Sequence, residues 1–471
     1  MEQHNDRIEE SKTDVTPRLV LKSSENRCIA SGHKRYEPPS PCIFRVHEEL
    51  RNVNKEAYTP RLVSIGPYHH GHPKLLAMEK HKERYFKLVL RRTNQTQKYY
   101  LDSMKQPAKI ARKYYADPID DDLNSDKFVK MMLYDACFIV EFLDLVPQSD
   151  RQSQQGQQSQ DMGHDYDPIF NTSWMRAHIC CDLMRLENQL PFFVIFKFFS
   201  LVTETQDPPT SIFKKLAENP FCCIIPKTSD FSRFNFEDKS VSESKHFLDL
   251  LHNVYHPHPP SSREKSNECQ GKNQRICFKM PSVIELQDAG IKFEAVEDDD
   301  DDKLNLNMFD IRFKDGHFKI PKFNVDDWTE TFFRNIIAYE QHSSDDEPQY
   351  FTDYTYFMDL LINSREDVKQ LRRHDVLDNW LGDDEEVALM FNKLGHGRMI
   401  ANQFYYAEMC SEVNAYCKRW GNRAKASLKR DYFKNIWVTV ATMAAAFLLL
   451  LTLTQTVIAL IMIIISPPSR H

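Results

Sequence analysis

The chain is poor in glycine, with 12 among 471 residues. Proteins average roughly 7% glycine, which supplies the backbone angles of tight turns and of loops that wrap phosphate groups. Nor does the chain contain GxxxxGK[ST], GxGxxG, HExxH or GxSxG, the motifs of nucleotide-binding folds, zinc proteases and serine hydrolases. The scarcity argues against phosphate loops and a turn-rich all-β fold, and it favours a helical protein.

Cysteine patterns that bind metals are also missing. The 11 cysteines include no CxxC, and the adjacent pairs 180–181 and 222–223 are poorly spaced for ligating one ion. Cys137 lies in the apolar run LYDACFIVEFL, where a free thiol behaves as a small buried hydrophobe. The polar start MEQHNDRIEESKTD lacks the apolar segment of a secretory signal peptide. We expect reduced thiols in the cytosol.

Strong net charge is absent too. The formal charge of -7 gives no general attraction to nucleic acid, so we expect no nucleic-acid partner. Hydrophobic residues make up 41% of the chain and aromatic residues 12%, values typical of a folded protein.

What the sequence does contain is one long uncharged run near its end. Residues 436–465, IWVTVATMAAAFLLLLTLTQTVIALIMIII, include no charged side chain. A bilayer core about 30 Å thick needs roughly 20 apolar residues in a helix, and Trp437 lies where an interfacial aromatic residue would anchor the span. The run predicts a transmembrane helix over 436–465, followed by a short tail, 466–471.

Positive charge gathers on one side of this run. Seven cations precede it, against one acid, Asp431; they are Lys418, Arg419, Arg423, Lys425, Lys429, Arg430 and Lys434. After the run only Arg470 is cationic. The positive-inside rule therefore predicts that residues 1–435 are cytosolic, with the anchor in the plasma membrane or an endomembrane. The alternative role of the cluster is attraction to anionic lipid.

The predicted span also carries features of helix pairing. Ala441 and Ala445 are four residues apart, a spacing at which two helix backbones approach closely. Thr452, Gln455 and Thr456 lie on one side, about a turn or more further along. We expect weak self-association through the membrane helix, with a plain anchor as the alternative.

The rest of the chain reads as a flexible arm, 1–40, and a single large helical domain, 41–434. Three polar stretches interrupt that domain near 147–169, 226–274 and 294–304. Around KDGH, alternating apolar residues on both sides of an Asp-Gly turn predict a minor β element near 291–321. The fold class expected is mainly α.

Individual helices follow from apolar spacing and end signals. Residues 126–146 are apolar on most sides yet carry internal charges, which predicts a central core helix rather than a membrane span. A further helical stretch, 174–202, should break near Leu190, because Pro191 disfavours the α conformation there. Ser364 and Asp367 form a variant capping box at the start of another helix.

The most unusual local feature is SIGPYHHGHPKLLAMEKHKERYF, residues 64–86. His70 and His72 would face one way in an extended segment, with His69 opposite. Zinc needs three or four converging ligands, so this segment alone is insufficient. We favour a rigid turn before the helix that follows Lys74, and we expect no catalytic, metal or cofactor-binding residue. The alternative is a metal-assisted enzyme that uses the His-rich 69–72 region with Glu187 of LENQLP.

The same residues carry a resemblance. AYTPRLVSIGPYHHGHPKLLAMEKHK resembles the opening motif of the plant-specific family of domain of unknown function 247, the UPF0481 group. YDACFIVEFL, DLMRLENQLPFFVI, VIELQDAGIKF, FRNIIAYEQ and YFMDLLINSREDV follow in the family's order. The resemblance covers about 42–465. It implies a plant origin, a helical domain, a C-terminal membrane helix and no established enzymatic activity.

Some grass relatives in this family are associated with self-incompatibility, as male-side recognition determinants. The resemblance does not assign that role to this chain, because the family is large. Together with the sequence features it favours a membrane-anchored interaction, recognition or signalling component that is not an enzyme. Its protein partner is unknown, and the polar insertions would determine which partner binds, because loops vary on a fixed scaffold.

Overall fold

The structure is a computed structural model. It describes residues 41–155, 167, 169, 172–203, 212, 243–255, 279–296, 307–343, 348–399, 404–419 and 436–465. Within these ranges the protein is mainly α-helical with few strands, which confirms the predicted fold class. The arm 1–40, the tail 466–471 and most of the three predicted insertions lie outside the described residues.

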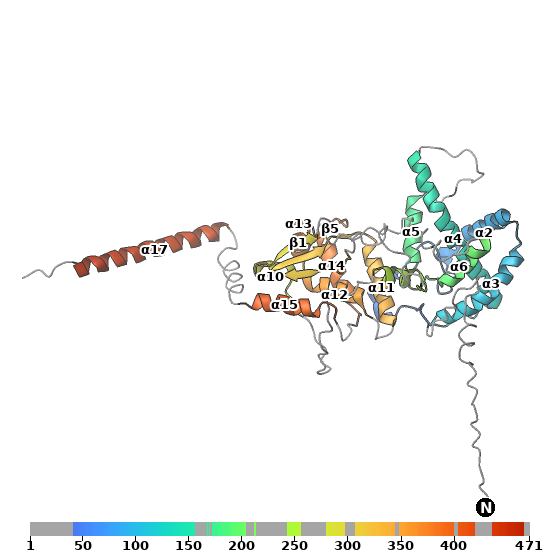
Figure 1. The fold of residues 1–471 in the computed structure, drawn as a ribbon, viewed down its shortest axis with the longest axis horizontal. Helices are drawn as coiled ribbons and strands as arrows, with labels where there is room; N and C mark the ends of the chain where they lie inside the picture. The colour runs from blue at the N-terminus through green and yellow to red at the C-terminus, as the bar shows by residue number, and fades with distance from the viewer. Residues whose placement is uncertain are drawn as a thin grey trace, which may run out of the picture.

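Four helices pack together in the N-terminal half (Figure 1): α2 (Leu76–Thr93), α3 (Gln97–Ala111), α4 (Ser125–Gln155) and α6 (Phe192–Val202). Residues 135–143 of α4 are all buried, so it is the core helix that the sequence predicts. The helix continues to Gln155, into the range 147–169 predicted as a polar insertion. A polar composition prevents burial of a segment but does not prevent it from being helical.

The predicted break near Pro191 is present. Helix α5 (Ser173–Leu183) ends well before it, and α6 begins at Phe192. The intervening residues 184–191 form turns and are buried although several are polar. The connection therefore lies inside the protein, and its polar groups need partners there.

A small sheet in the C-terminal half has the order β1–β3–β2, with β1 (Lys292–Val296) parallel to β3 (His317–Pro321) and β2 (Arg312–Lys314) antiparallel to it. Asp315 and Gly316 both have positive φ, +50° and +83°, as a two-residue hairpin turn requires. This confirms the predicted hairpin. Strand β1 includes the first three residues of the predicted insertion 294–304.

A second pair of strands was not predicted. β4 (Phe323–Val325) runs parallel to β5 (Leu377–Asn379). Each strand is only three residues long, and the two are more than 50 positions apart. Such a pair leaves no alternating pattern long enough to detect in the sequence.

Helices surround these strands: α10 (Val283–Asp288), α11 (Thr329–His342), α12 (Tyr350–Leu361), α13 (Arg365–Arg373), α14 (Asp384–Leu394) and α15 (Ala407–Lys418). The capping box at the start of α13 is formed by Ser364 and Asp367, as predicted. Helix α15 packs on β2 and is the last helix described before residue 436.

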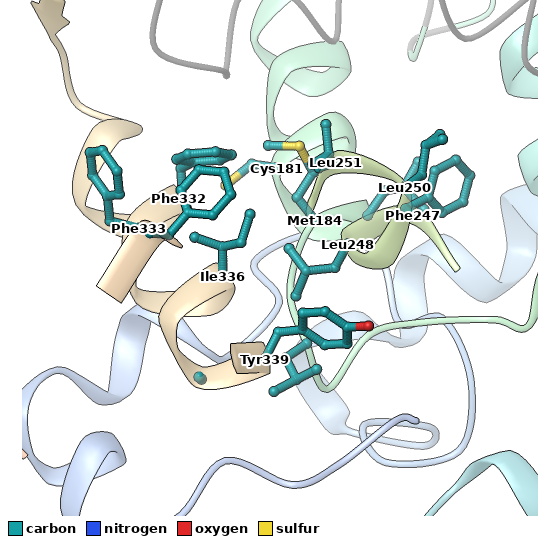
Figure 2. Close-up of a cluster of buried hydrophobic side chains, with 14 of the residues drawn as sticks. Cys181, Met184, Phe247, Leu248, Leu250, Leu251, Phe332, Phe333, Ile336 and Tyr339 are labelled. Atoms are coloured by element: carbon teal, nitrogen blue, oxygen red, sulfur yellow. The ribbon is translucent and has the colours of Figure 1, made fainter. Parts of the chain in front are cut away.

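One contiguous core joins the two halves, from Cys42 to Val413. Its middle is shown in Figure 2, where α9 (Phe247–Val254) and α11 present apolar side chains to the end of α5. Helix α9 is the short amphipathic piece within the predicted insertion 226–274. Shorter elements complete the body: α1 (Glu48–Val53), η1 (Lys55–Ala57), η2 (Pro73–Leu75) and η3 (Arg112–Tyr114).

The C-terminal run forms a single helix, α17 (Ile436–Ile465), drawn apart from the body in Figure 1. By length and composition, its segment Thr439–Met462 is long and apolar enough to cross a membrane, and none of that span is buried against the protein. At 1.5 Å per residue, its 24 residues extend about 36 Å.

Candidate functional site

Five polar side chains, at the end of α5 and in the connection from α5 to α6, are almost completely buried: Asp182, Arg185, Glu187, Asn188 and Gln189, each at most 1% exposed. We call these residues the polar cluster. Removing such groups from water costs free energy unless each finds a partner inside the protein. Their partners therefore show what the cluster does.

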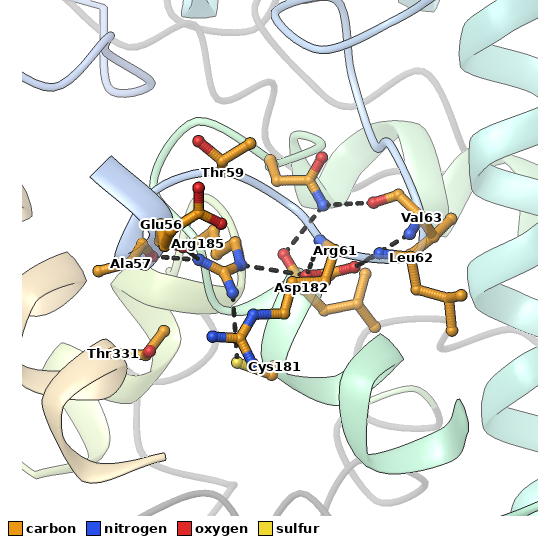
Figure 3. Close-up of polar contacts among 12 residues, drawn as sticks. Glu56, Ala57, Thr59, Arg61, Leu62, Val63, Cys181, Asp182, Arg185 and Thr331 are labelled. Carbon is orange, nitrogen blue, oxygen red and sulfur yellow. Dashed lines mark hydrogen bonds and ion pairs between the residues drawn. The ribbon is translucent and has the colours of Figure 1, made fainter. Parts of the chain in front are cut away.

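Asp182 and Asn188 bind the main chain of a distant segment. The Asp182 carboxylate accepts hydrogen bonds from the amides of residues 61–63, at 2.7–3.0 Å (Figure 3). The Asn188 amide accepts one from Ile65 N at 2.7 Å and donates one to Val63 O at 3.0 Å. Residues 61–65 have no regular secondary structure. The side chains of Asp182 and Asn188 supply the hydrogen bonds that a neighbouring strand would otherwise give to their main chain.

Arg185 extends the same arrangement towards η1. Its Nε donates to Asp182 Oδ1 at 3.0 Å, and its Nη1 donates to the carbonyls of Glu56, at 2.8 Å, and Ala57 (Figure 3). From α11, Asn335 accepts from Leu186 N and donates to Ala57 O, both at 2.9 Å. The cluster therefore connects three segments that are far apart in sequence.

Glu187 is the second acid of the cluster, after Asp182. Its Oε1 accepts from Val46 N at 2.6 Å and pairs with the Arg51 guanidinium. Its Oε2 lies 3.1 Å from His69 Nε2, an ion-pair distance, although the two groups are not aligned for a hydrogen bond. Burial raises the pKa of Glu187, but His69, Arg51 and the Val46 amide outweigh it, and the net pKa is lowered.

The structure does not bring His70 and His72 to Glu187. Both side chains are exposed, in two successive turns closed by bonds from His70 N to Pro67 O, at 3.4 Å, and from His72 N to His69 O, at 3.2 Å. The alternation in the sequence correctly predicts that His69 lies on the opposite side from His70 and His72. Sequence reasoning selected the outward pair, however, because nothing local identifies Arg51 and Glu187 as the partners of the inward histidine.

The polar cluster stabilises the main chain of a neighbouring segment by hydrogen bonding. Asp182, Arg185 and Asn188 each bind backbone groups of residues 56–65. Among the described residues, no group of three or more His, Cys, Asp or Glu is placed to hold a metal ion. The absence of a metal at the His-rich turn stays a prediction, tested below.

Comparison with known proteins addresses the family. A family model described as a plant protein of unknown function, DUF247, matches residues 43–451. This chain belongs to that family. The match includes the His-rich turn and the polar cluster, and it extends into α17.

Two relatives come from Arabidopsis thaliana. UPF0481 protein At3g47200 is 28% identical over 440 residues, covering 90% of this chain and 87% of the relative. Putative UPF0481 protein At3g02645 is 23% identical over 496 aligned residues, covering 88% and 89%. No solved structure is significantly similar to the chain. The names of these two relatives assign no activity.

Proposed function

We propose that this protein is a membrane-anchored interaction component without catalytic activity, held at a membrane by α17. The observation that supports this most directly is the exposure of α17. Its large side chains are exposed, with Phe447, Leu449 and Leu453 each more than 60% exposed, and they contact no core. Each such side chain left in water costs about 1.5–3 kcal/mol relative to burial, whereas a bilayer would bury all of them together.

The polar cluster supports a scaffold rather than a reaction centre. Its side chains hydrogen-bond to the main chain of residues 56–65 and fix the segment that leads into the His-rich turn. A rigid body of this kind can present variable segments to a partner. In our proposal the insertions determine the partner, and the body provides a fixed frame.

Membrane anchoring is tested with the full chain and with a chain that ends at residue 435, each fused to a fluorescent protein in plant cells. We expect the full chain to remain in the membrane pellet after alkaline carbonate extraction and the shortened chain to become soluble. Release of the full chain by carbonate would overturn the anchor.

Catalysis with a metal is tested by metal analysis of the full chain purified in detergent. We expect less than one equivalent of zinc, iron, manganese or copper. One equivalent that is lost in the double variant His70→Ala and His72→Ala, but retained in His396→Ala, would support the enzyme alternative instead. His396 is an exposed histidine outside the turn and therefore a matched control.

Partner choice is tested by proximity biotinylation in plant cells. Because α9 is part of the core, the exchange must leave residues 243–255 in place. Residues 256–274 are therefore replaced by a Gly-Ser segment of equal length. We expect the replaced chain to keep its membrane location and to lose specific neighbours. An unchanged set of neighbours for this replacement, and for one of residues 297–304, would contradict the assigned role of the insertions.

A further inference from the structure

Two buried carboxylates lie at the start of α12. Glu340, on α11, accepts hydrogen bonds from Phe351 N at 2.9 Å and Thr352 N at 2.7 Å, so it caps α12 from a neighbouring helix. Asp353 follows in the first turn of α12 and is 3% exposed. Two buried acids, one on α11 and one on α12, therefore lie at the start of α12.

The two oxygens of Asp353 differ. Oδ2 accepts a hydrogen bond from Tyr405 N at 2.7 Å. Oδ1 is buried and has no hydrogen-bond partner. A carboxyl with one unsatisfied buried oxygen is costly to ionise, because no donor stabilises the negative charge there, whereas the protonated carboxyl carries no charge.

The charged groups around Asp353 come from several elements. Glu340 contributes a like charge from α11, and His252 of α9 contacts that acid at 3.1 Å. Arg398 is nearby, but its guanidinium is committed to Thr355 at 3.0 Å and to Asp359 at 3.1 Å. Burial, with a smaller contribution from Glu340, raises the pKa of Asp353 to about 7, against the lowering effects of the Tyr405 amide and Arg398.

The bonded amide belongs to the segment that leads into α15. Around it, the Tyr406 ring lies 4.8 Å from Phe357 and the Phe404 ring 5.3 Å from Tyr356. We propose that Asp353 is a proton-dependent latch that holds the start of α15 against α12. The protonated carboxyl keeps the latch closed, and the ionised carboxylate favours its release into water.

The far end of α15 is attached differently. The Tyr416 ring packs on Phe313 at 5.7 Å, and Gly316 leaves room for the Tyr416 hydroxyl, which a Cβ there would approach to 2.4 Å. Opening of the latch therefore frees the N-terminal end of α15 first. This proposal goes beyond the proposed function, and it would hold even for a chain that is not anchored in a membrane.

The direction of the pH effect follows from the two states. Asp353 has a pKa of about 7 when closed, against an ordinary value of 3.8 when open in water. Between pH 3.8 and pH 7 opening therefore releases a proton. In this range the opening equilibrium constant rises by up to tenfold per pH unit, and it levels off above about pH 7. Between pH 5 and pH 8 the expected change is about a hundredfold.

The test is hydrogen exchange with mass spectrometry on the full chain in detergent, at pH 5, 6, 7 and 8, corrected for intrinsic exchange. We expect peptides that cover 404–413 to open more as pH rises to 7, and by less than about a further twofold between pH 7 and pH 8. Asp353→Asn, which stays neutral and still accepts from Tyr405 N, should abolish this dependence. Asp384→Asn is the control, because Arg372 and Asn379 donate to Asp384.

The wild-type profile can overturn the latch even if Asp353→Asn fails to fold. Opening of 404–413 that is independent of pH in the wild type overturns the latch. The same pH dependence in Asp353→Asn as in the wild type also overturns it. A pH-dependent opening that Asp353→Asn removes and Asp384→Asn retains supports it.

Discussion

Lys82 Nζ lies 2.6 Å from Asp135 Oδ1, and both side chains are at most 1% exposed. The same ammonium donates to Glu79 Oε1, also at 2.6 Å, and to Ser64 O. Asp135 in turn accepts from Gly66 N at 2.8 Å. Burial lowers the pKa of Lys82, but the two carboxylates outweigh it and raise the net pKa. The lysine therefore stays charged and joins α2 and α4 to residues 64–66, which lead into the His-rich turn.

Replacing this lysine should strongly destabilise the protein. Lys82→Met leaves the Asp135 carboxylate buried without its cation, and we expect a loss of about 3–5 kcal/mol in the free energy of unfolding. Urea denaturation of the full chain in detergent measures it. Lys87→Met is the matched control, because Lys87 is exposed and its ion pair is with exposed Glu83. A change within 1 kcal/mol for Lys82→Met would refute the structural role of the pair.

Gly66 and Gly71 allow the cost of a steric clash to be compared with the cost of backbone strain. Both have positive φ, +74° at Gly66 and +79° at Gly71. A Cβ at Gly66 would lie 2.5 Å from Gln189 O and 2.9 Å from the Tyr115 hydroxyl, whereas a Cβ at Gly71 meets nothing within 4 Å. We expect Gly71→Ala to cost about 1 kcal/mol, from backbone strain alone. Gly66→Ala should cost at least about 2 kcal/mol more.

Thermal unfolding of both glycine variants provides the measurement. Equal losses of Tm would mean that residue 66 is not pressed against the polar cluster. A larger loss of Tm for Gly71→Ala than for Gly66→Ala would contradict the predicted clash at residue 66.

Sequence patterns predicted most of the helices but not the buried polar contacts. Apolar spacing, Pro191 and the Ser364–Asp367 box are local signals, so α4, the break before α6 and the start of α13 could be predicted. Glu187 and Arg51 are 136 positions apart, and their pairing depends on how α1 packs against the polar cluster. No periodicity encodes that geometry, and for the same reason the parallel pairings of β1 with β3 and β4 with β5 were missed.

The buried His246 should make the folded protein less stable at acidic pH. The ring is buried, its Nδ1 accepts from Asp249 N at 3.2 Å, and Nε2 lies 3.0 Å from Cys42 O, an arrangement that suits the neutral tautomer. Burial lowers its pKa from 6.5 to about 4, more than Asp249 raises it. The unfolded chain therefore binds a proton that the folded chain does not, and stability present above pH 6.5 is lost as pH falls towards 4.

The lost contribution is about 3 kcal/mol at 1.36 kcal/mol per pKa unit. Denaturation of the full chain at pH 7, 6, 5 and 4 should show this slope, and His246→Asn should reduce it, since Asn can cap α9 but does not titrate. His70→Asn is the matched control, being exposed. An equal slope in wild type and His246→Asn would show that other groups cause the acid sensitivity.

The orientation of the body can be read from one sequon. Asn94-Gln95-Thr96 lies in the exposed turn between α2 and α3, and the Asn94 backbone has a φ of +52°. The second sequon, at Asn171, lies outside the described residues. Glycosylation of asparagine occurs only in the lumen. With residues 1–435 in the cytosol, Asn94 should carry no sugar in plant cells.

A second glycosylation reporter, placed after α17, tests the opposite side of the membrane. A polar tail of about 30 residues with its own sequon, added after His471, should be glycosylated. Endoglycosidase treatment followed by a mobility shift detects either outcome. Sugar on Asn94, with none on the added tail, would reverse the predicted topology.

The candidate membrane span α17 supplies the last prediction, weak self-association. Three threonines of α17 satisfy their hydroxyls within the helix; Thr452, Thr454 and Thr456 each donate to a carbonyl three or four residues earlier, at 2.6–3.0 Å. These hydroxyl donors are therefore already used, and they provide little reason for a second helix to bind.

Gln455 has a different requirement. Its amide carries both donors and an acceptor, and in hydrocarbon it gains from a partner that offers the same groups, such as Gln455 of a second copy. Ala441 and Ala445 lie on the same side, within about 100° at 100° per residue, and allow close approach of the backbones. The gain is about 0.6–2 kcal/mol, so pairing should be weak.

A bacterial membrane two-hybrid assay of Ile436–Ile465 measures this association directly. We expect Gln455→Leu and Ala445→Leu to lower the signal several-fold. Two variants on other faces serve as matched controls: Ala446→Leu changes the neighbouring alanine, and Thr454→Leu removes a polar group that is already bonded. Both should leave the signal intact, because neither faces the pairing side. Equal losses in all four variants would point to impaired insertion, and no signal for the wild-type helix would make α17 an anchor alone.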